Sequence, residues 1–111
     1  MVARIWRGAV RRTDGDAYAD YIEETGVAEY LGTPGNLGAN MLRRDVGDKC
    51  EFLMLTFWDS IDAVKEFAGE DYERAVYYAE DERFLIEKDD TTSHWEVALH
   101  SEGGRKAADR G

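Results

Sequence analysis

Three tyrosines and one histidine are the side chains in this sequence best suited to proton transfer. Tyr72, Tyr77 and Tyr78 lie close together along the chain, and His94 directly precedes Trp95. A tyrosine hydroxyl donates hydrogen bonds and can relay a proton, and an imidazole changes its charge near neutral pH. The same residue types also serve as interfacial tyrosines and as solvated or interface histidines. Both interpretations are therefore kept for each of these four candidate catalytic residues.

We predict no metal site and no cofactor. His94 and His100 fall on one face of a predicted strand, but they are about 20 Å apart and cannot share a metal ion. Cys50 is the only cysteine and lies in an apolar stretch, which favours packing over reactivity. The sequence contains no phosphate-binding loop, dinucleotide fingerprint or Ser/His/Asp set.

The charge of the chain excludes two classes of partner. Fourteen Lys+Arg against 24 Asp+Glu give a net charge of -10, which opposes binding to nucleic acids and to anionic membranes. No apolar run reaches membrane-spanning length and no signal-peptide pattern is present, so the expected location is cytoplasmic. Four arginines near strand faces are expected to pair with the many acids: Arg4, Arg7, Arg43 and Arg44.

The stretch from Cys50 to Gly69 positions most of the candidates. Its first half predicts a strand that is apolar on both faces. One face carries Phe52, Met54, Thr56 and Trp58, and the other carries Leu53, Leu55 and Phe57. Ser60 is a good helix N-cap and Gly69 a good stop, so a helix is predicted over Ser60–Ala68.

The other elements follow from apolar periodicity and turn residues. A helix is predicted from Thr13 to about Leu31, with an inner stripe of Ala17, Tyr18, Tyr21, Ile22 and Thr25. The predicted strands are Val2–Val10, Asn36–Val46, Cys50–Trp58 and Thr91–Ser101, with a hairpin turn at Asp45–Asp48. We also predict a short helix over Tyr72–Tyr78, a loop over Ala79–Asp90 and a disordered tail over 102–111, which leaves residues 1–101 as one domain.

This order of elements predicts a ferredoxin-like α+β fold, βαββαβ, with an antiparallel sheet. Both helices of that fold cover one face of the sheet and leave the other face bare. Leu53, Leu55 and Phe57 lie on the bare face, and burying each of them is worth roughly 1.5–3 kcal/mol. We therefore expect a homodimer that packs through these sheet faces.

The segment TFWDSIDAVKEFAGED resembles the motif of the antibiotic biosynthesis monooxygenase superfamily, in which a strand ends in Trp and leads into a helix with an inner aromatic residue. The connector GTPGNLG and the order of elements extend the resemblance over residues 2 to 100. The resemblance implies a dimeric α+β barrel with a cavity between helices and sheet. Trp58 would project into that cavity, and the other residues expected to contact substrate are Phe52, Met54, Thr56, Tyr18, Tyr21 and Trp6.

The resemblance also implies a function, namely cofactor-independent oxidation of an aromatic or polyketide-like small molecule. Tyr72, Tyr77, Tyr78 or His94 would then handle the proton. Met54 stands where some quinone-forming members place an Asn, so quinone-forming oxidation is unsupported at its polar anchor. Tyr77 and Tyr78 stand where haem-degrading members place a His, and the first strand has no Asn, so haem degradation is disfavoured. Two alternatives stay open, a non-oxidative binding or cyclase-like protein and a dimeric module with a solid interior.

Overall fold

An antiparallel sheet of five strands carries the helices of this chain, whose computed structural model describes residues 1–103. The strands are β1 (Val2–Arg11), β2 (Asn36–Val46), β3 (Lys49–Trp58), β4 (Leu85–Lys88) and β5 (Ser93–Glu96). Their order is β2-β3-β1-β4, with β5 also paired to β1. Most of the predicted tail, residues 104–111, lies outside the described residues.

The last strand position of the ferredoxin-like fold is shared by two short strands. β1 pairs with β3 along its whole length, from Val2 opposite Trp58 to Arg11 opposite Lys49. β4 pairs with the end of β1, and β5 pairs with its beginning. Together β4 and β5 occupy the place of one strand beside β1. The predicted α+β class and its antiparallel sheet are therefore confirmed.

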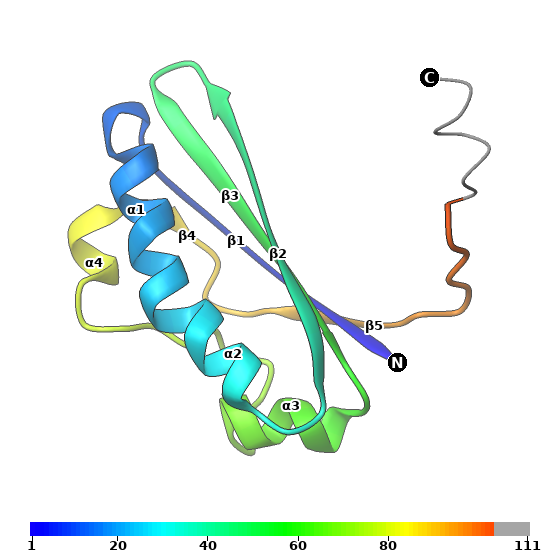
Figure 1. Ribbon diagram of the computed structural model, residues 1–111. Helices are drawn as coiled ribbons and strands as arrows, with labels where there is room; N and C mark the ends of the chain where they lie inside the picture. The colour runs from blue at the N-terminus through cyan, green and yellow to red at the C-terminus, as the bar shows by residue number, and fades with distance from the viewer. Residues whose placement is uncertain (104–111) are drawn as a thin grey trace.

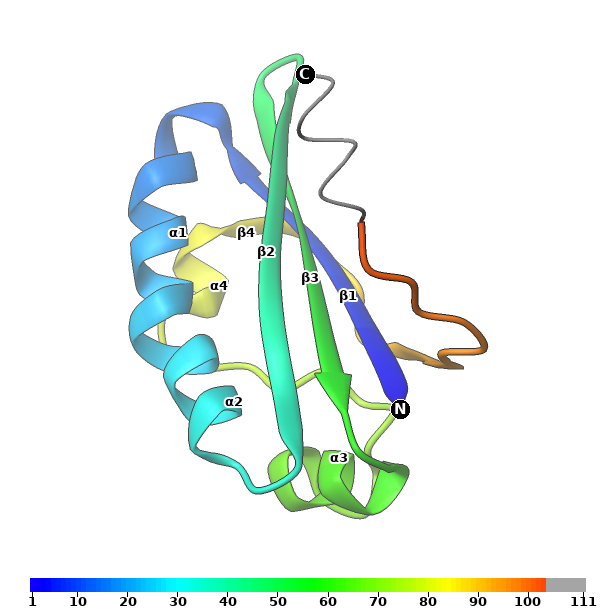
Figure 2. The same cartoon turned by 45° about the vertical axis from the view of Figure 1, so that its right-hand side comes forward.

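The helices lie along one face of the sheet and at one end of it (Figure 1). A continuous helical segment runs through a 3-10 turn at Arg12–Asp14, α1 (Gly15–Ile22), a π-helical turn at Glu23–Val27 and α2 (Ala28–Gly32). Figure 2 shows α1 and α2 beside the sheet, with α3 (Ile61–Ala68) at its lower end. The predicted start of α3 is confirmed, because the Ser60 hydroxyl accepts a hydrogen bond from the Ala63 amide at 3.2 Å.

The predicted helix over Tyr72–Tyr78 is wrong. This segment is irregular because its backbone groups bond sideways to residues 90–92 and not along a helix. The amide of Ala75 donates to the carbonyl of Asp90 at 2.9 Å, and the amide of Thr92 donates to the carbonyl of Glu73 at 2.7 Å. The long-range pairing thus competes successfully with local helix propensity.

The predicted loop over Ala79–Asp90 is also wrong, because this segment forms α4 (Asp81–Phe84) and β4. The acids at this place do not all face water. Glu87 forms ion pairs with Arg7 of β1 and with Lys49 at the start of β3. The acidic composition of this segment predicts a solvated loop, but cations distant in the sequence hold it in the sheet.

The last predicted strand is too long, since β5 covers only Ser93–Glu96. Beyond it, the amide of Val97 donates to the carbonyl of Met1 at 2.9 Å, and no further strand follows within the described residues. Trp95 and Leu99 are exposed, so they do not form a buried face with Val97. Ala17 is likewise exposed, although the periodicity placed it in the inner stripe of the helix.

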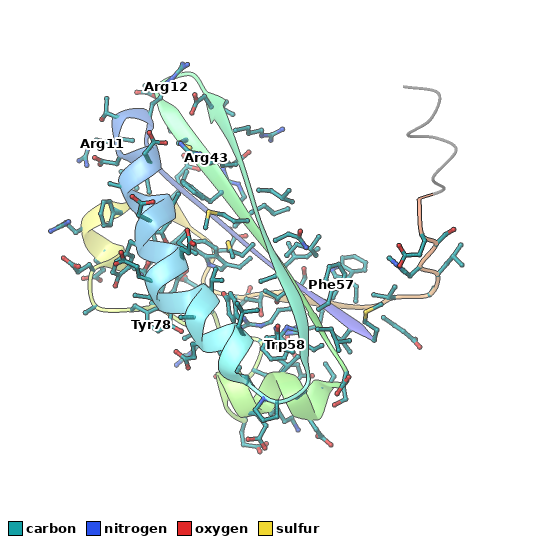
Figure 3. All side chains as sticks on the ribbon, viewed as in Figure 1. Arg11, Arg12, Arg43, Phe57, Trp58 and Tyr78 are labelled. Carbon is teal, nitrogen blue, oxygen red and sulfur yellow. The ribbon has the colours of Figure 1, made fainter. Side chains whose placement is uncertain are left out.

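The two faces of β3 differ as its alternation predicts. Phe52, Met54, Thr56 and Trp58 are buried under the helices, and Cys50 is buried with them. Leu53, Leu55 and Phe57 lie on the opposite face and are half-buried. Figure 3 shows Trp58 on the side of α2 and α3 and Phe57 on the side away from them. The core therefore lies between the sheet and the helical layer.

Candidate functional site

A small cavity lies between the sheet and the helical layer, under the segment that joins α3 to α4. Its volume is about 30 Å³. Strands β1 and β3, helices α1 and α2, and the segment Val76–Asp81 each contribute part of its wall. The lining residues are Arg4, Trp6, Tyr18, Ile22, Thr25, Gly26, Tyr30, Met54, Val76, Tyr77, Tyr78, Asp81 and Thr92.

Asp81 is the carboxylate of this wall, and only 5% of its surface is exposed. The Tyr18 hydroxyl donates to its Oδ1 at 2.8 Å, and the backbone amide of Tyr78 donates to its Oδ2 at 2.5 Å. Burial, followed by the charge of Asp81, raises the pKa of Tyr18 far above its ordinary value. Tyr18 is therefore a neutral hydrogen-bond donor, and Asp81 retains lone pairs for a further proton.

Tyr77 is held in place by Trp6. The Trp6 indole N–H donates to the Tyr77 hydroxyl oxygen at 3.1 Å and to the carbonyl of Asp89 at 3.0 Å. The Tyr77 hydroxyl in turn donates to the same carbonyl. The two rings meet edge to face with centroids 6.0 Å apart. Burial raises the pKa of Tyr77, so this hydroxyl is also protonated at neutral pH.

Tyr78 presents its ring to the cavity but sends its hydroxyl elsewhere. That hydroxyl donates to Glu29 on the helical layer, beside which Figure 3 places Tyr78. Burial, followed by the contact with Glu29, raises the pKa of Tyr78. Of the three tyrosines considered for proton transfer, Tyr77 and Tyr78 line the cavity, and only Tyr77 keeps its hydroxyl bonded to groups on the sheet side.

Tyr72 and His94 form a separate pair outside the cavity. Their rings meet edge to face at 5.0 Å and line a surface groove with Glu73, Thr92 and Ser93. Burial, followed by the charge of Arg4 on the neighbouring strand, lowers the pKa of His94 to about 4. His94 is thus a neutral imidazole at pH 7. The structure does not bring it together with Tyr77 and Asp81.

Trp58 does not line the cavity, because it lies behind Tyr30, which is part of the cavity wall. Its indole N–H donates to the Thr56 hydroxyl at 2.9 Å, and its ring packs against Phe67 at 5.7 Å and Tyr30 at 6.2 Å. Tyr30 stands between Trp58 and the cavity, so Trp58 does not line it. Thr56 shares this buried position behind the wall.

The remaining predicted contact residues divide between wall and core. Trp6, Met54 and Tyr18 line the cavity. Phe52 does not, because it packs edge-on against Tyr18 with ring centroids 5.1 Å apart. Tyr21 stacks on the other side of Tyr18 at 6.3 Å, and its hydroxyl accepts from the Glu80 amide at 2.9 Å. Tyr21 therefore anchors the turn that precedes Asp81.

Sequence reasoning missed Arg4, Tyr30 and Asp81. Arg4 alternates with Trp6 on the inner face of β1, so its burial could have been recognised from strand periodicity. Tyr30 follows Tyr18, Ile22 and Gly26 at four-residue intervals, which is a signal for one helix face. Asp81 gives no local signal, because only the fold brings Tyr18 to it.

The expectation that all four arginines pair with acids is wrong for Arg4. Arg7 and Arg44 both contact Glu51, and Arg43 contacts Asp16 at 2.9 Å, as expected. Arg4 is only 3% exposed, and within residues 1–103 it has no carboxylate in ion-pair distance. Its Nη2 donates to the carbonyls of Tyr72 and Arg74 at 3.4 and 3.3 Å, and its buried Nε has no partner there.

The described residues contain neither a metal-binding cluster nor a helix that could span a membrane. Within residues 1–103 no group of three or more His, Cys, Asp or Glu side chains could hold a metal ion. Over the same part of the chain, no helix is long and apolar enough to span a membrane.

The sequence matches no protein-family model and no curated protein. Solved structures share its fold, among them a candidate antibiotic biosynthesis monooxygenase from Bacillus cereus, with 14% identity and a TM-score of 0.63 over 92% of this chain and 97% of that chain. The heme-degrader MhuD from Mycobacterium tuberculosis has 19% identity and a TM-score of 0.58 over 92% and 100%. A NIPSNAP-like domain protein from Burkholderia xenovorans has 13% identity and a TM-score of 0.59 over 91% and 89%.

These identities are low, so the likeness concerns the backbone and not the chemistry. It extends over nearly the whole of this chain and of each neighbour. The resemblance inferred from the residues around Trp58 is thus matched by the arrangement of strands and helices. The chain therefore has the same α+β fold as these solved structures, one of which is described as a candidate antibiotic biosynthesis monooxygenase.

Proposed function

We propose that this protein is a cofactor-independent monooxygenase that acts on a small phenol or enol held in the cavity under α1 and α2. One observation carries the proposal: a buried carboxylate, Asp81, shares the cavity wall with tyrosines whose hydroxyls stay protonated. A base beside neutral donors suits removal of a substrate proton and stabilisation of the oxyanion that results. The shared fold supports the choice of reaction class.

The chemistry assigned to the chain is proton transfer and charge stabilisation. Asp81 takes the proton of a substrate hydroxyl or of an acidic carbon. Tyr77 donates a hydrogen bond to the oxyanion after its hydroxyl turns away from the carbonyl of Asp89, to which it donates in this structure. The electron-rich anion then passes electrons to O₂, which combines with it at carbon. One oxygen atom ends as a new carbonyl and the other leaves as water, and the substrate CH₂ group supplies all the electrons. No external reductant is needed for this balance.

The volume of the cavity limits the substrate. About 30 Å³ is far below the roughly 300–1,000 Å³ of typical ligand pockets. A polycyclic phenol or a tetrapyrrole requires movement of the wall, whereas a fragment with one ring requires the least. The segment Val76–Tyr78 has no regular secondary structure, but its displacement would break the hydrogen bonds that Tyr77 and Tyr78 make to Trp6 and Asp81. The proposal therefore favours a small substrate and does not extend to haem.

We also propose that the chain forms a homodimer through the outer face of its sheet. Leu53, Leu55 and Phe57 lie there, and the pairing of strands places Ile5 opposite Leu55 and Leu42 opposite Leu53. A network of Arg7, Arg44, Glu51, Lys49 and Glu87 borders this apolar strip. An apolar strip with a charged margin is the usual composition of an interface between subunits.

Oxygen uptake with a one-ring probe tests the proposed reaction. With 1,3,5-trihydroxybenzene, which has an accessible keto form, we expect uptake that depends on enzyme concentration. Asp81→Asn should lower the rate about 10²–10⁴-fold, because the base is removed while the volume is kept. Asp20→Asn, at an exposed position on α1, is the matched control and should retain the rate.

A second candidate, non-oxidative binding or a cyclase-like reaction, is favoured by the presence of the cavity alone. The same assay separates the two, since product formation without oxygen supports the non-oxidative candidate. Product that forms only in air supports the monooxygenase. Equal rates for wild type and Asp81→Asn would reject the role assigned to Asp81.

A further inference from the structure

Arg4 is a buried cation for which residues 1–103 provide no compensating anion. It stands on the central strand β1, faces the helical layer and lines the cavity. The residue is only 3% exposed, its Nε is buried without a hydrogen-bond partner, and its Nη2 makes two long bonds to backbone carbonyls. Buried charges in proteins are normally paired, because an unpaired one loses its hydration without compensation.

The surroundings of Arg4 are aromatic and do not neutralise it. Its guanidinium lies over the ring of Phe67 at 5.4 Å from the centroid, and Tyr30 and Tyr78 are the ionisable groups whose charges would affect it most. Both tyrosines have a raised pKa and remain neutral. Within residues 1–103 the other strand arginines, Arg7, Arg43 and Arg44, each contact a carboxylate. The inner face of β1 thus carries an unsatisfied positive charge.

We infer that Arg4 binds a carboxylate of the ligand, so that the substrate class is a small organic acid. This inference rests on the proposed function, because it takes the cavity as the substrate site, and it adds the charge of the substrate. A guanidinium pairs well with a carboxylate, which is anionic before the reaction begins. A neutral phenol would leave Arg4 uncompensated until it lost its proton.

Asp81 shares the wall and would repel a ligand carboxylate that lay beside it. The Tyr18 hydroxyl and the Tyr78 amide each donate one hydrogen bond to Asp81, which leaves lone pairs to accept a substrate proton. The wall therefore carries two polar groups that form no ion pair with each other, the cation Arg4 and the proton acceptor Asp81. A substrate that presents its carboxylate to Arg4 is oriented with its reacting group toward Asp81 and Tyr77.

The test uses formate as the smallest carboxylate and formamide as its neutral analogue, with ionic strength held constant by NaCl. Formate should raise the melting temperature of the wild type along a saturable curve, and formamide should not. In Arg4→Met the apparent affinity for formate should fall at least about tenfold, whereas it should be unchanged in Arg11→Met, an exposed position at the end of the same strand.

A purely structural Arg4, tying the segment Tyr72–Arg74 to β1, gives a different pattern. Arg4→Met would then melt lower without ligand and respond to formate as the wild type does, which overturns the inference. An equal response of the wild type to formate and formamide also overturns it. If Arg4→Met does not fold, the wild type is titrated by NMR, where the Arg4 Nε–H signal should shift saturably with formate and not with formamide. A signal that formate leaves unchanged would contradict the inference.

These readouts are independent of oxygen chemistry. Formate binding through Arg4 in a protein that consumes no oxygen with any probe would reject the monooxygenase and keep the anion site. Oxygen uptake with a phenol that carries a carboxylate, equal in wild type and Arg4→Met, would reject the anion site and keep the monooxygenase. The two proposals can therefore fail separately.

Discussion

Asp81 and His94 are two potential bases that the fold places in different environments. Asp81 is buried on the cavity wall and accepts bonds from Tyr18 and Tyr78, whereas His94 faces Tyr72 in a groove outside it. Arg4 on the neighbouring strand adds positive charge next to the imidazole. The proton chemistry is therefore assigned to the carboxylate, and the imidazole is expected to affect mainly the pH dependence of stability.

His94 should destabilise the fold in mild acid. Its pKa is about 4 in the folded chain, against an ordinary value of 6.5, so the unfolded state binds a proton first as the pH falls. Stability should decline from about pH 6.5 to about pH 4 and should change no further through this group below its folded pKa. Urea unfolding at each pH measures this slope, and His94→Gln should reduce it. An imidazole that titrates by NMR near its ordinary pKa would contradict the assignment.

Some residues of the cavity wall could be predicted from local sequence patterns, and others are placed by contacts between residues far apart in the sequence. Strand and helix periods predicted the inward positions of Trp6, Tyr18 and Met54, which do line the cavity. Asp81 could not be found in this way, because its partner Tyr18 lies 63 positions away in the sequence. Trp58 was expected in the cavity, but its ring packs against Tyr30 of α2, and Tyr30 lines the cavity in its place.

At the scale of elements, the connection from α2 to β2 packs closely against the start of α3. Gly35 has a φ of 88°, in the left-handed region that favours glycine, and its carbonyl accepts the amide of Asp59 at 2.8 Å. A Cβ at this position would lie 2.5 Å from the Cβ of Ala63. Both the backbone conformation and the space therefore require glycine.

Gly35→Ala should destabilise the fold by about 1–3 kcal/mol, because it adds backbone strain and a contact with α3. Gly32→Ala is the matched control, since a Cβ there meets nothing within 4 Å and alanine is the better helix residue. The free energies of unfolding in urea compare the two variants. A Gly35→Ala protein as stable as the wild type would show that this connection does not limit stability.

The elements that sequence predicted correctly are those whose signals are local. The hairpin between β2 and β3 follows from Gly47, and the start of α3 follows from Ser60. β4 was missed because its pairing depends on distant residues. Glu87 resembles one member of an acidic loop until β1 supplies Arg7 and the hairpin supplies Lys49.

At the scale of the whole molecule, the outer sheet face is the surface through which we propose that two copies assemble. Leu53, Leu55 and Phe57 are half-buried in a single chain, although they occupy the middle of the sheet. Each square ångström of apolar surface removed from water contributes about 25 cal/mol. A second copy that packs on this face would recover that energy at no cost to the helical layer.

Leu55→Asp should convert the proposed dimer into a monomer, because a carboxylate would be buried between two sheets without a partner. Leu31→Asp is the matched control, because Leu31 is 64% exposed on α2 and lies outside the sheet. Light scattering after size exclusion at micromolar concentration reports the mass of each variant. A monomeric wild type, or a dimeric Leu55→Asp, would contradict the proposed interface.

The most direct test of the proposed function separates binding from oxidation in one sample. Native mass spectrometry under nitrogen first identifies a phenol or enol that is bound to the wild-type protein, and isotopically heavy O₂ is then admitted. We predict a product that carries one heavy oxygen atom, and a much slower conversion in Asp81→Asn. Release of the bound molecule unchanged in the presence of oxygen would contradict the proposed monooxygenase.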